Sequence, residues 1–253
     1  MAIVVQRVQP GEPDRDVTRL AVVFPAYNEE EHVAEAVAAA LGVGAGHVVC
    51  VNDCSTDNTG SIVDGLAADG RVEAIHHQVN QGKQAAVKHG LAAAVAHADA
   101  DVIAVLDADM QDDPALLPAL CHHVGPYDLV IGCRGRGDMP RIRRLANVLA
   151  NAPYRLIAGI GITDVQSGYR IYARQVAEYL ARHLAVKGGY TLEHTSMLLF
   201  GKLARTWGRE FKIAEINVPY TYEGAQSSIG VKDNLQLTWA SIYHAWALAR
   251  LRR

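Results

Sequence analysis

Several features that would assign a class of protein at once are missing from the sequence. No window comes near the roughly 20 uninterrupted apolar residues that a membrane-spanning helix needs, and the first residues form no signal-peptide pattern. There is no basic excess either: the formal net charge is −3, whereas a nucleic-acid-binding protein needs a dense basic surface. We therefore expect a cytoplasmic protein that does not bind nucleic acid.

Cysteine is scarce, and its spacing suggests no paired site. The sequence has no C-x-x-C arrangement of the kind that holds a metal or forms a redox motif. Reduced, buried thiols are the expectation for a cytosolic protein. The adjacent histidine pairs diverge on a helix or a strand and have no third ligand spaced with them, so we expect no zinc site. The cysteines are Cys50, Cys54, Cys121 and Cys133.

What the sequence does have is an alternation of apolar β-type runs with alanine-rich helical stretches. This indicates an α/β fold, a mostly parallel sheet with helices on both faces, whose ligand crevice lies at the carboxyl ends of the strands. We divide the chain into a flexible leader over 1–19, one domain over 20–230 and a C-terminal amphipathic helix over 231–253. The predicted strands are Leu20–Phe24, His47–Val51, Val72–His76, Val102–Leu106, Leu129–Gly132, Tyr169–Tyr172 and Phe211–Val218, the last as an edge or mixed strand because Pro219 follows it.

The most informative segment follows the strand Val102–Leu106. It contains Asp107, Asp109 and Gln111. Side chains two apart on extended backbone share a face, so these three can point at one ligand if the strand geometry persists. Such oxygen ligands suit Mg²⁺ or Mn²⁺ and leave positions for phosphate oxygens. Asp-x-Asp alone is also common in solvated acidic turns. The neighbouring strand ends decide between the two interpretations.

Those neighbouring strand ends are polar in a coordinated way. After the first strand, Pro25 fixes the exit of the chain and Tyr27 can stack on a planar base. After the second, Asp53 can accept a hydrogen bond from a nucleobase N–H. After the third, the loop leading to Lys83 can approach phosphate or sugar through its backbone and that side chain. Taken singly, each is explicable as a turn or a helix cap.

Together and in this order, these segments resemble glycosyltransferases of the GT-A fold, family 2, and within it the branch of dolichol-phosphate mannose synthases and related polyprenyl-phosphate sugar transferases. The resemblance covers roughly residues 20–222. It implies a Rossmann-like GT-A domain with a C-terminal acceptor-side extension. The motifs that carry it are Pro25-Ala26-Tyr27-Asn28-Glu29, Asp53-Cys54-Ser55-Thr56-Asp57, Asn80-Gln81-Gly82-Lys83, Asp107-Ala108-Asp109-Met110-Gln111 and Asp164-Val165-Gln166-Ser167-Gly168-Tyr169-Arg170.

The resemblance also implies roles for individual residues. Arg134 and Arg170 match positions that approach the acceptor phosphate, and guanidinium groups pair bidentately with phosphate oxygens. A surface ion pair is the alternative for each arginine. The implied nucleotide-sugar-binding residues are Pro25, Tyr27, Glu29, Asp53, Lys83, Asp107, Ala108, Asp109 and Gln111, the metal ligands are Asp107, Asp109 and Gln111, and the catalytic residues are Asp109, Arg134, Asp164 and Arg170.

The predicted reaction is the metal-dependent, inverting transfer of a hexose from GDP-mannose or a UDP-sugar to a polyprenyl phosphate. Mg²⁺ or Mn²⁺ would neutralise the departing diphosphate, and a phosphate acceptor needs no general base because it is already anionic. A soluble hydroxyl acceptor, as in natural-product or polysaccharide biosynthesis, would need one, with Asp164 or Glu193 as candidates. The alternative from another class is a non-catalytic nucleotide-sugar-binding protein.

After its last predicted strand the chain departs from the pattern of the branch. Where the branch has an arginine and a lysine that close over the phosphates, this chain has Glu223 and Ile229. A carboxylate at that place would repel a phosphate group, which favours the soluble acceptor. Lys232 and Arg209 are candidates to compensate.

The final helix leaves two interpretations open. It contains Trp239 and Trp246 and ends in arginines, a composition that suits the surface of a membrane. It equally suits packing on the catalytic domain, where basic residues at the helix end complement the dipole. Peripheral contact with the inner face of the membrane is therefore one of the two expectations.

Overall fold

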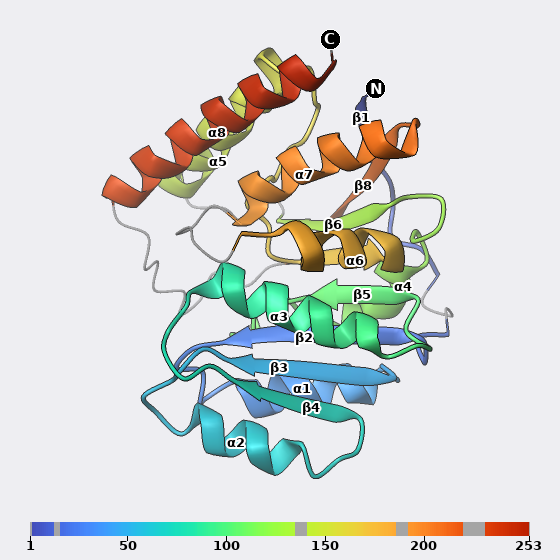
Figure 1. Ribbon diagram of the computed structural model, residues 1–253, viewed down its shortest axis with the longest axis vertical. Helices are drawn as coiled ribbons and strands as arrows, with labels where there is room; N and C mark the ends of the chain where they lie inside the picture. Colours follow the sequence, from blue (N-terminus) through green and yellow to red (C-terminus); the bar gives the residue numbers. More distant parts are fainter. Residues whose placement is uncertain (1, 13–15, 135–140, 186–191, 220–230, 253) are drawn as a thin grey trace.

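An eight-stranded sheet runs through the residues that the computed structural model describes, which are 2–12, 16–134, 141–185, 192–219 and 231–252. Its strand order is β1-β8-β6-β7-β5-β2-β3-β4 (Figure 1). Neighbouring strands are parallel except for β7, which is antiparallel to both β5 and β6. The strands are β1 (Ile3–Arg7), β2 (Leu20–Ala26), β3 (His47–Asn52), β4 (Val72–His76), β5 (Val102–Val105), β6 (Leu129–Arg134), β7 (Arg170–Ala173) and β8 (Phe211–Val218).

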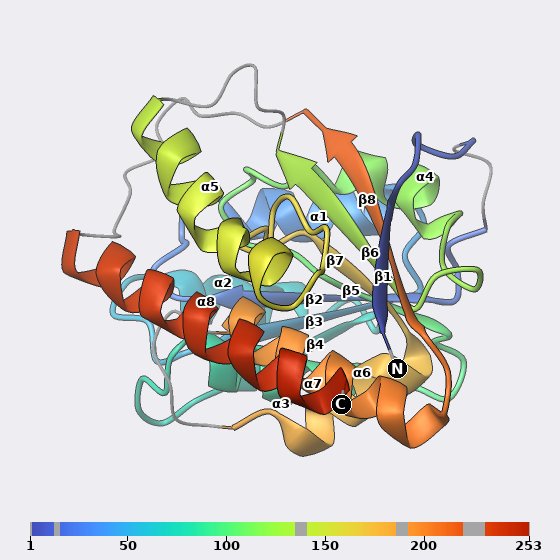
Figure 2. The same cartoon turned by 90° about the horizontal axis from the view of Figure 1, so that it is seen from above.

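Helices cover both faces of this sheet (Figure 2). One hydrophobic core joins the sheet to α3, α5, α6, α7 and α8, and a second core joins it to α1, α2 and α4. The result is a sandwich of three layers with the sheet in the middle. The helices are α1 (Val33–Gly42), α2 (Thr59–Leu66), α3 (Lys83–Ala96), α4 (Leu117–Cys121) with a short 3₁₀ turn (Pro114–Leu116) before it, α5 (Arg141–Leu156), α6 (Arg174–His183), α7 (Leu192–Trp207) and α8 (Val231–Arg252).

The central strands are continuously apolar because both of their faces are covered. In β2, Leu20–Phe24 is buried throughout, and burial on both faces removes the polar alternation of a half-exposed strand. On one face α3 packs so closely that a Cβ on Gly90 would lie 2.3 Å from Val23 Cγ1. A glycine is required at this crossing of helix and sheet.

The sequence prediction is wrong at two places in the sheet. Residues 1–19 were expected to be a flexible leader, yet Ile3–Arg7 form β1 and pair in parallel with β8. The segment Phe211–Val218 was expected to be an edge or mixed strand, yet it lies between β1 and β6 and is parallel to both. Pro219 follows the strand rather than interrupting it, so its missing N–H removes no ladder bond. The mostly parallel sheet itself is confirmed.

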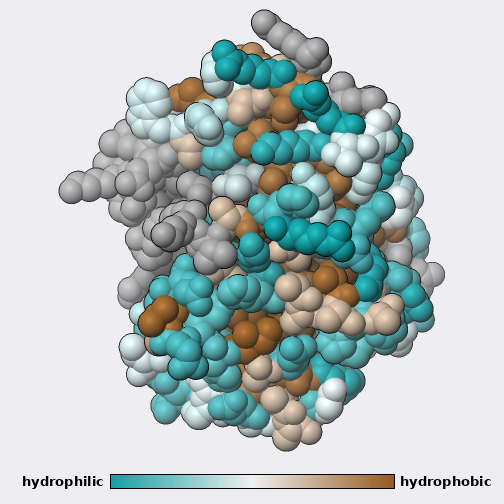
Figure 3. Space-filling model, viewed as in Figure 1, coloured by the Kyte–Doolittle hydropathy of each residue, from teal (hydrophilic) through white to brown (hydrophobic). Residues whose placement is uncertain are grey.

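Outside the grey residues, the face of the molecule in Figure 3 shows no dominant apolar area. Among the residues coloured there, small hydrophobic areas are separated by hydrophilic ones. None of the helices in the described ranges is both long and apolar enough to cross a membrane.

Candidate active site

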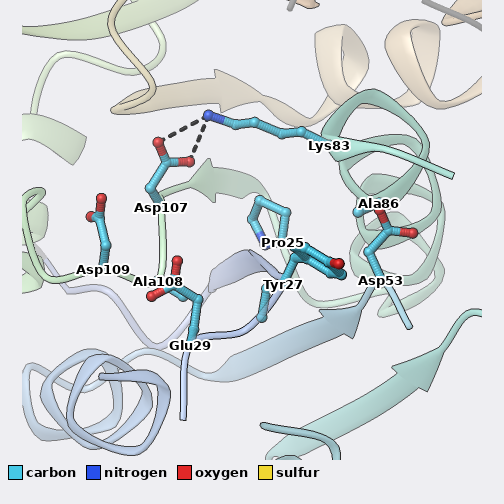
Figure 4. Close-up of a pocket in the computed structure, with 10 residues that line it drawn as sticks. Pro25, Tyr27, Glu29, Asp53, Lys83, Ala86, Asp107, Ala108 and Asp109 are labelled. Carbon is cyan, nitrogen blue, oxygen red and sulfur yellow. Dashed lines mark hydrogen bonds and ion pairs between the residues drawn. The ribbon is translucent and has the colours of Figure 1, made fainter. Parts of the chain in front are cut away.

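A pocket of about 270 Å³ opens at the carboxyl ends of β2, β3 and β5 (Figure 4). This is the edge at which a parallel sheet exposes its crevice. The pocket brings together most of the residues named from the sequence, whereas Gln111, Arg134, Asp164 and Arg170 are not among those that line it. Its lining consists of Pro25, Ala26, Tyr27, Glu29, Asp53, Lys83, Ala86, Asp107, Ala108 and Asp109.

The backbone is strained where each of these three strands leads into the site. Asn28, Cys54 and Met110 have φ angles of 57°, 61° and 59°, and they are the non-glycine residues with positive φ in the described parts of the chain. A side chain in this left-handed region costs roughly 1–2 kcal/mol per residue, and such strain gathers at functional sites. The three turns redirect the chain so that side chains from separate strands face one pocket.

The turn at Met110 overturns the prediction about Gln111. Strand β5 ends at Val105, so the alternation of an extended strand does not continue to Gln111. Its backbone N–H instead donates to Asp109 Oδ1 at 3.0 Å. This segment therefore orients Asp109 through the backbone, and the expectation that strand geometry aligns all three side chains is wrong.

Acidic side chains crowd this edge of the sheet. Burial, followed by repulsion from Asp109, raises the pKa of Glu29 to about 7. Burial and then Asp107 raise the pKa of Asp109. The same two causes raise the pKa of Asp112, a buried residue that the sequence reasoning did not select. The sequence did hold a clue to Asp112, because this residue follows Asp109 of the Asp-x-Asp segment by three residues. Like charges held this close favour either a proton or a cation.

Lys83 provides the nearest positive charge. Its Nζ lies 2.7 Å from Asp107 Oδ1 and 2.9 Å from Oδ2 (Figure 4), and 3.9 Å from Glu193 Oε1 on α7. Desolvation lowers the pKa of Lys83, but Asp107 and Glu193 outweigh it, so the pKa is raised overall. The lysine is therefore a cation at any ordinary pH and partly neutralises the cluster.

Asp53 is fixed by three donors. Its carboxylate accepts from the backbone N–H of Gln81 at 2.8 Å and of Gly82 at 2.7 Å, and its Oδ1 lies 2.6 Å from His77 Nδ1. The loop before α3 was expected to approach phosphate or sugar through its backbone. That expectation is wrong for these two amides, because both are directed at Asp53.

Arg134 and Asp164 form a bidentate ion pair beside the pocket. Arg134 Nη2 lies 2.7 Å from Asp164 Oδ1, and Nε lies 2.8 Å from Oδ2. Asn147 Nδ2 donates to the same Oδ1 at 2.8 Å, and Asp164 is buried. Both oxygens of this carboxylate are therefore already engaged by donors of the protein. Of the two interpretations of Asp164, the geometry matches the ion pair.

Arg170 is buried at the start of β7. Its Nε donates to Ser167 O at 3.0 Å and its Nη2 to Val165 O at 2.6 Å, while Nη1 is buried with no hydrogen-bond partner. The motif that contains it passes close to the acidic cluster, since a Cβ on Gly168 would lie 2.9 Å from Asp107 Oδ2. Segments far apart in the sequence thus meet at Asp107.

The segment that departs from the branch pattern, with Glu223 and Ile229, lies outside the described residues, as does the side chain of Lys232. Arg209 is described, and it pairs with Asp128 through contacts of 2.6 and 2.9 Å. Both residues lie at the amino ends of β6 and β8, the opposite edge of the sheet. The expectation that Arg209 compensates for Glu223 is therefore wrong.

The acidic residues do not form a complete metal site by themselves. Within the described ranges, no group of three or more His, Cys, Asp or Glu side chains could hold a metal ion. Asp107 and Asp109 nevertheless offer the hard oxygen ligands that Mg²⁺ and Mn²⁺ bind, and Mg²⁺ is commonly held by one or two carboxylates together with substrate phosphates. The pair therefore fits a cation that arrives with a diphosphate.

Comparison with known proteins assigns the family. The profile of Glycosyl transferase family 2 matches residues 21–180. The chain belongs to this family. It is 29% identical to a polyprenol monophosphomannose synthase of Mycolicibacterium smegmatis, covering 82% of this chain and 79% of that protein. It is 32% identical to an undecaprenyl-phosphate mannosyltransferase of Micrococcus luteus, covering 61% and 66%.

Solved structures confirm the fold. Glucosyl-3-phosphoglycerate synthase from Mycobacterium tuberculosis, in a complex with phosphoglyceric acid, superposes with a TM-score of 0.69 at 18% identity, covering 97% of this chain and 88% of that chain. A complex of the same enzyme with Mn²⁺, UDP and phosphoglyceric acid superposes with a TM-score of 0.68. The predicted family 2 glycosyltransferase and the GT-A fold are confirmed.

Proposed function

We propose that the protein is a metal-dependent, inverting glycosyltransferase that moves a hexose from a GDP- or UDP-sugar to a polyprenyl phosphate. The observation that carries this proposal is the pocket at the carboxyl ends of β2, β3 and β5, where Asp107 and Asp109 lie beside Glu29 and Asp53. The similarity to two polyprenyl-phosphate mannosyltransferases supports the acceptor class.

The acidic cluster supports the choice of a divalent cation. Asp107 and Asp109 would hold Mg²⁺ or Mn²⁺. Burial, and after it repulsion from Asp109, raises the pKa of Glu29 to about 7, and a bound cation would relieve the repulsive part. When bound, the cation would stabilise negative charge on the leaving diphosphate. Lys83, already directed at Asp107, would turn to the diphosphate once the cation shares that carboxylate.

The donor's nucleoside fits the other end of the pocket. Tyr27 is about half exposed, so its ring is free to stack on a base. Asp53 lines the same pocket and accepts hydrogen bonds only. This pair would accommodate either uracil or guanine, since both carry a ring N–H.

The acceptor's phosphate would meet the arginines. Arg170 has one guanidinium nitrogen without a partner, and Arg134 would exchange part of its pairing with Asp164 for phosphate oxygens. Attack by an anionic phosphate oxygen on the face opposite the diphosphate inverts the sugar carbon. No group has to remove a proton, and positioning supplies most of the acceleration.

A soluble hydroxyl acceptor is the second candidate, and one observation favours it. Glu193 Oε1 lies 3.9 Å from Lys83 Nζ, so a carboxylate of α7 lies near a residue that lines the pocket. Unlike Asp164, it is not locked in a bidentate ion pair and would serve as the base that a hydroxyl requires.

The experiment offers GDP-mannose, UDP-glucose and UDP-N-acetylglucosamine with Mn²⁺ or Mg²⁺, with and without a polyprenyl phosphate, and detects products by mass spectrometry. We expect a sugar–phosphate–lipid from one donor. Metal-dependent donor binding with no lipid product would reject the lipid acceptor and leave the soluble acceptor and the non-catalytic protein as the two alternatives. No donor binding would reject the proposal.

The same proposal includes peripheral contact with the membrane that holds the lipid acceptor. Most of the strongly exposed large hydrophobic residues in the described ranges lie on α5, on α8, which packs against it, or directly after α5. On α8, Trp239, Tyr243 and Trp246 recur at helical spacing, and Arg250 lies 3.6 Å above the Trp246 ring. The exposed residues are Leu145, Val148, Leu149, Leu156, Ile157, Trp239, Tyr243 and Trp246.

The charge of these two helices suits an anionic membrane surface. They contain Asp233 as their one acidic residue, although the chain as a whole has a formal net charge of −3. A composition rich in aromatic, apolar and basic residues is typical of helices that lie in a membrane interface. The basic residues are Arg141, Arg143, Arg144, Arg155, Lys232, Arg250 and Arg252.

Flotation with vesicles tests this contact. We expect binding to phosphatidylcholine vesicles that contain phosphatidylglycerol, and weaker binding without it. Replacing Trp239 and Tyr243 by serine should lower the affinity by about tenfold or more, because two exposed rings are removed. Val79, 64% exposed away from these helices, gives the matched control Val79→Ser. Equal binding of both variants would contradict the contact.

A further inference from the structure

Two histidines connect the nucleoside end of the pocket to the surface. His77 Nδ1 lies 2.6 Å from Asp53 Oδ1, and His77 Nε2 lies 2.8 Å from His89 Nδ1. The side chains of Asp53 and His77 are each 4% exposed, while His89 is only partly buried. Neither histidine belongs to the motifs that resemble the family.

Asp53 has little hydrogen-bonding capacity left. Its Oδ1 accepts from His77 and from the Gln81 N–H, and its Oδ2 accepts from the Gly82 N–H. A carboxylate offers about four lone-pair positions, two on each oxygen. One position therefore remains, on Oδ2, in a residue that lines the pocket.

We propose that His77, held in turn by His89, is a positioning residue that orients Asp53 so that its remaining acceptor position receives one N–H of the nucleobase. This rests on the proposed function, in which the nucleoside of the donor lies at Asp53. The row of side chains would then select bases by a single ring N–H and disfavour any base in which that nitrogen is blocked.

The contact with Asp53 fixes the place of one proton, because His77 must carry a proton on Nδ1 to donate to that carboxylate. A second proton lies between His77 Nε2 and His89 Nδ1, which are 2.8 Å apart, and the tautomers of the two rings decide which nitrogen donates. The groups that act on His89 are His77, Lys88 and Asp53; burial, His77 and Lys88 lower its pKa against the smaller effect of Asp53. At neutral pH His89 is therefore a neutral imidazole.

Calorimetry in the presence of Mn²⁺ tests the proposal with three kinds of probe: UDP and GDP, their N-methylated forms (3-methyl-UDP and 1-methyl-GDP), and inorganic pyrophosphate. The wild-type protein should prefer an unmethylated nucleotide by about tenfold, the value of one charge-assisted hydrogen bond. His77→Leu should remove most of that preference and leave pyrophosphate affinity unchanged. His89→Leu should lower the preference for unmethylated nucleotide about threefold, because one neutral hydrogen bond is lost.

His77→Asn is the rescue variant, because its side-chain N–H occupies nearly the position of Nδ1 and should restore most of the preference. It also keeps the test decisive if His77→Leu fails to fold. The proposal is overturned if both His77 variants behave alike, if pyrophosphate and nucleotide weaken together, or if wild-type protein ignores N-methylation. If wild-type protein binds pyrophosphate but shows no preference for unmethylated over methylated nucleotide, this proposal alone is overturned. If it binds neither pyrophosphate nor any nucleotide, the proposed function is rejected as well.

Discussion

Charged side chains are paired differently at the two edges of the sheet. At the amino ends of the strands, acids are matched one to one with bases: Asp128 pairs with Arg209, and Asp101 with Arg19. Arg174, at the same edge, donates to the carbonyl oxygens of Val95, His97 and Ala100. At the carboxyl ends Arg134 pairs with Asp164, but Glu29, Asp107, Asp109 and Asp112 cluster near Lys83 without one-to-one pairing, and their mutual repulsion contributes to the raised pKa values of three of them.

The backbone conformation also differs between the two edges of the sheet. The positive φ angles of Asn28, Cys54 and Met110 all lie at the carboxyl edge, and each costs free energy that the rest of the fold must offset. One edge of the sheet is therefore arranged for stability and the other for a ligand that brings positive charge. Substitutions at the two edges should consequently separate stability from activity.

The largest effect is expected at the carboxyl edge, from Asp109→Asn. Losing one anionic cation ligand should slow sugar transfer by about 10²-fold or more, the scale of removing one transition-state charge contact, and should abolish metal-dependent donor binding. The free energy of unfolding should stay equal or rise, because a repelling charge is removed. Transfer rates and denaturant unfolding of the same preparation check both parts; unchanged metal-dependent affinity would refute the role of Asp109.

Asp128→Asn is the matched substitution at the amino edge. It breaks the bidentate pair with Arg209 and weakens the contact with the Lys212 N–H. The free energy of unfolding should fall by about 2 kcal/mol, as for a lost charge-assisted bond at a buried carboxylate, while the folded variant keeps its transfer rate. Urea unfolding measures the loss, and a large loss of activity at full stability would break the proposed division between the edges.

Two substitutions at Cys54 test the backbone strain in one of these turns. Cys54 has φ 61°, which glycine adopts freely and a β-branched side chain does not. Cys54→Val should be less stable than Cys54→Gly by about 1–2 kcal/mol. Thermal unfolding of both variants measures the difference, and equal stability would show that the turn holds no strain.

The smallest effect is expected from pH in metal-free protein. The pKa of Glu29 is raised to about 7 and that of Asp112 is raised as well, so the folded state binds these protons more tightly than the unfolded state does. The free energy of unfolding therefore rises as the pH falls from above 7 toward about 4, where the unfolded carboxyl groups titrate.

We expect Tm at pH 6 to exceed Tm at pH 8 by about 2–4 °C, the change that one kcal/mol makes in a chain of this size. The double variant Glu29→Gln, Asp112→Asn should lose this difference. Scanning calorimetry measures it, and a wild-type Tm that rises with pH over this range would count against the repelling cluster.

The sequence predicted most of the sheet because its central strands are buried on both faces and form continuous apolar runs. It missed β1, whose short apolar run has no helix to link it to β2, and it missed the antiparallel direction of β7. The direction of a strand depends on how the chain returns to the sheet. The four residues of β7, Arg170–Ala173, carry no sequence pattern that shows this.

The site was predictable as a list of residues and less so as geometry. Motif order placed Asp53, Asp107 and Asp109 at one edge, and the pocket contains all three. The locking of Asp53 by His77 was not visible, because it joins two strand ends whose register only the folded sheet defines. The ion pair of Asp164 likewise depends on how a long connection folds back onto β6.

We propose that the carboxyl edge of the sheet binds a cation together with a nucleotide diphosphate. Calorimetry of UDP and GDP binding to the wild-type protein, with Mn²⁺ and then with EDTA, tests this. We expect Mn²⁺ to strengthen binding of at least one nucleotide by about tenfold or more, because it relieves repulsion between the acids and the diphosphate. Equal affinity with and without the metal would contradict it.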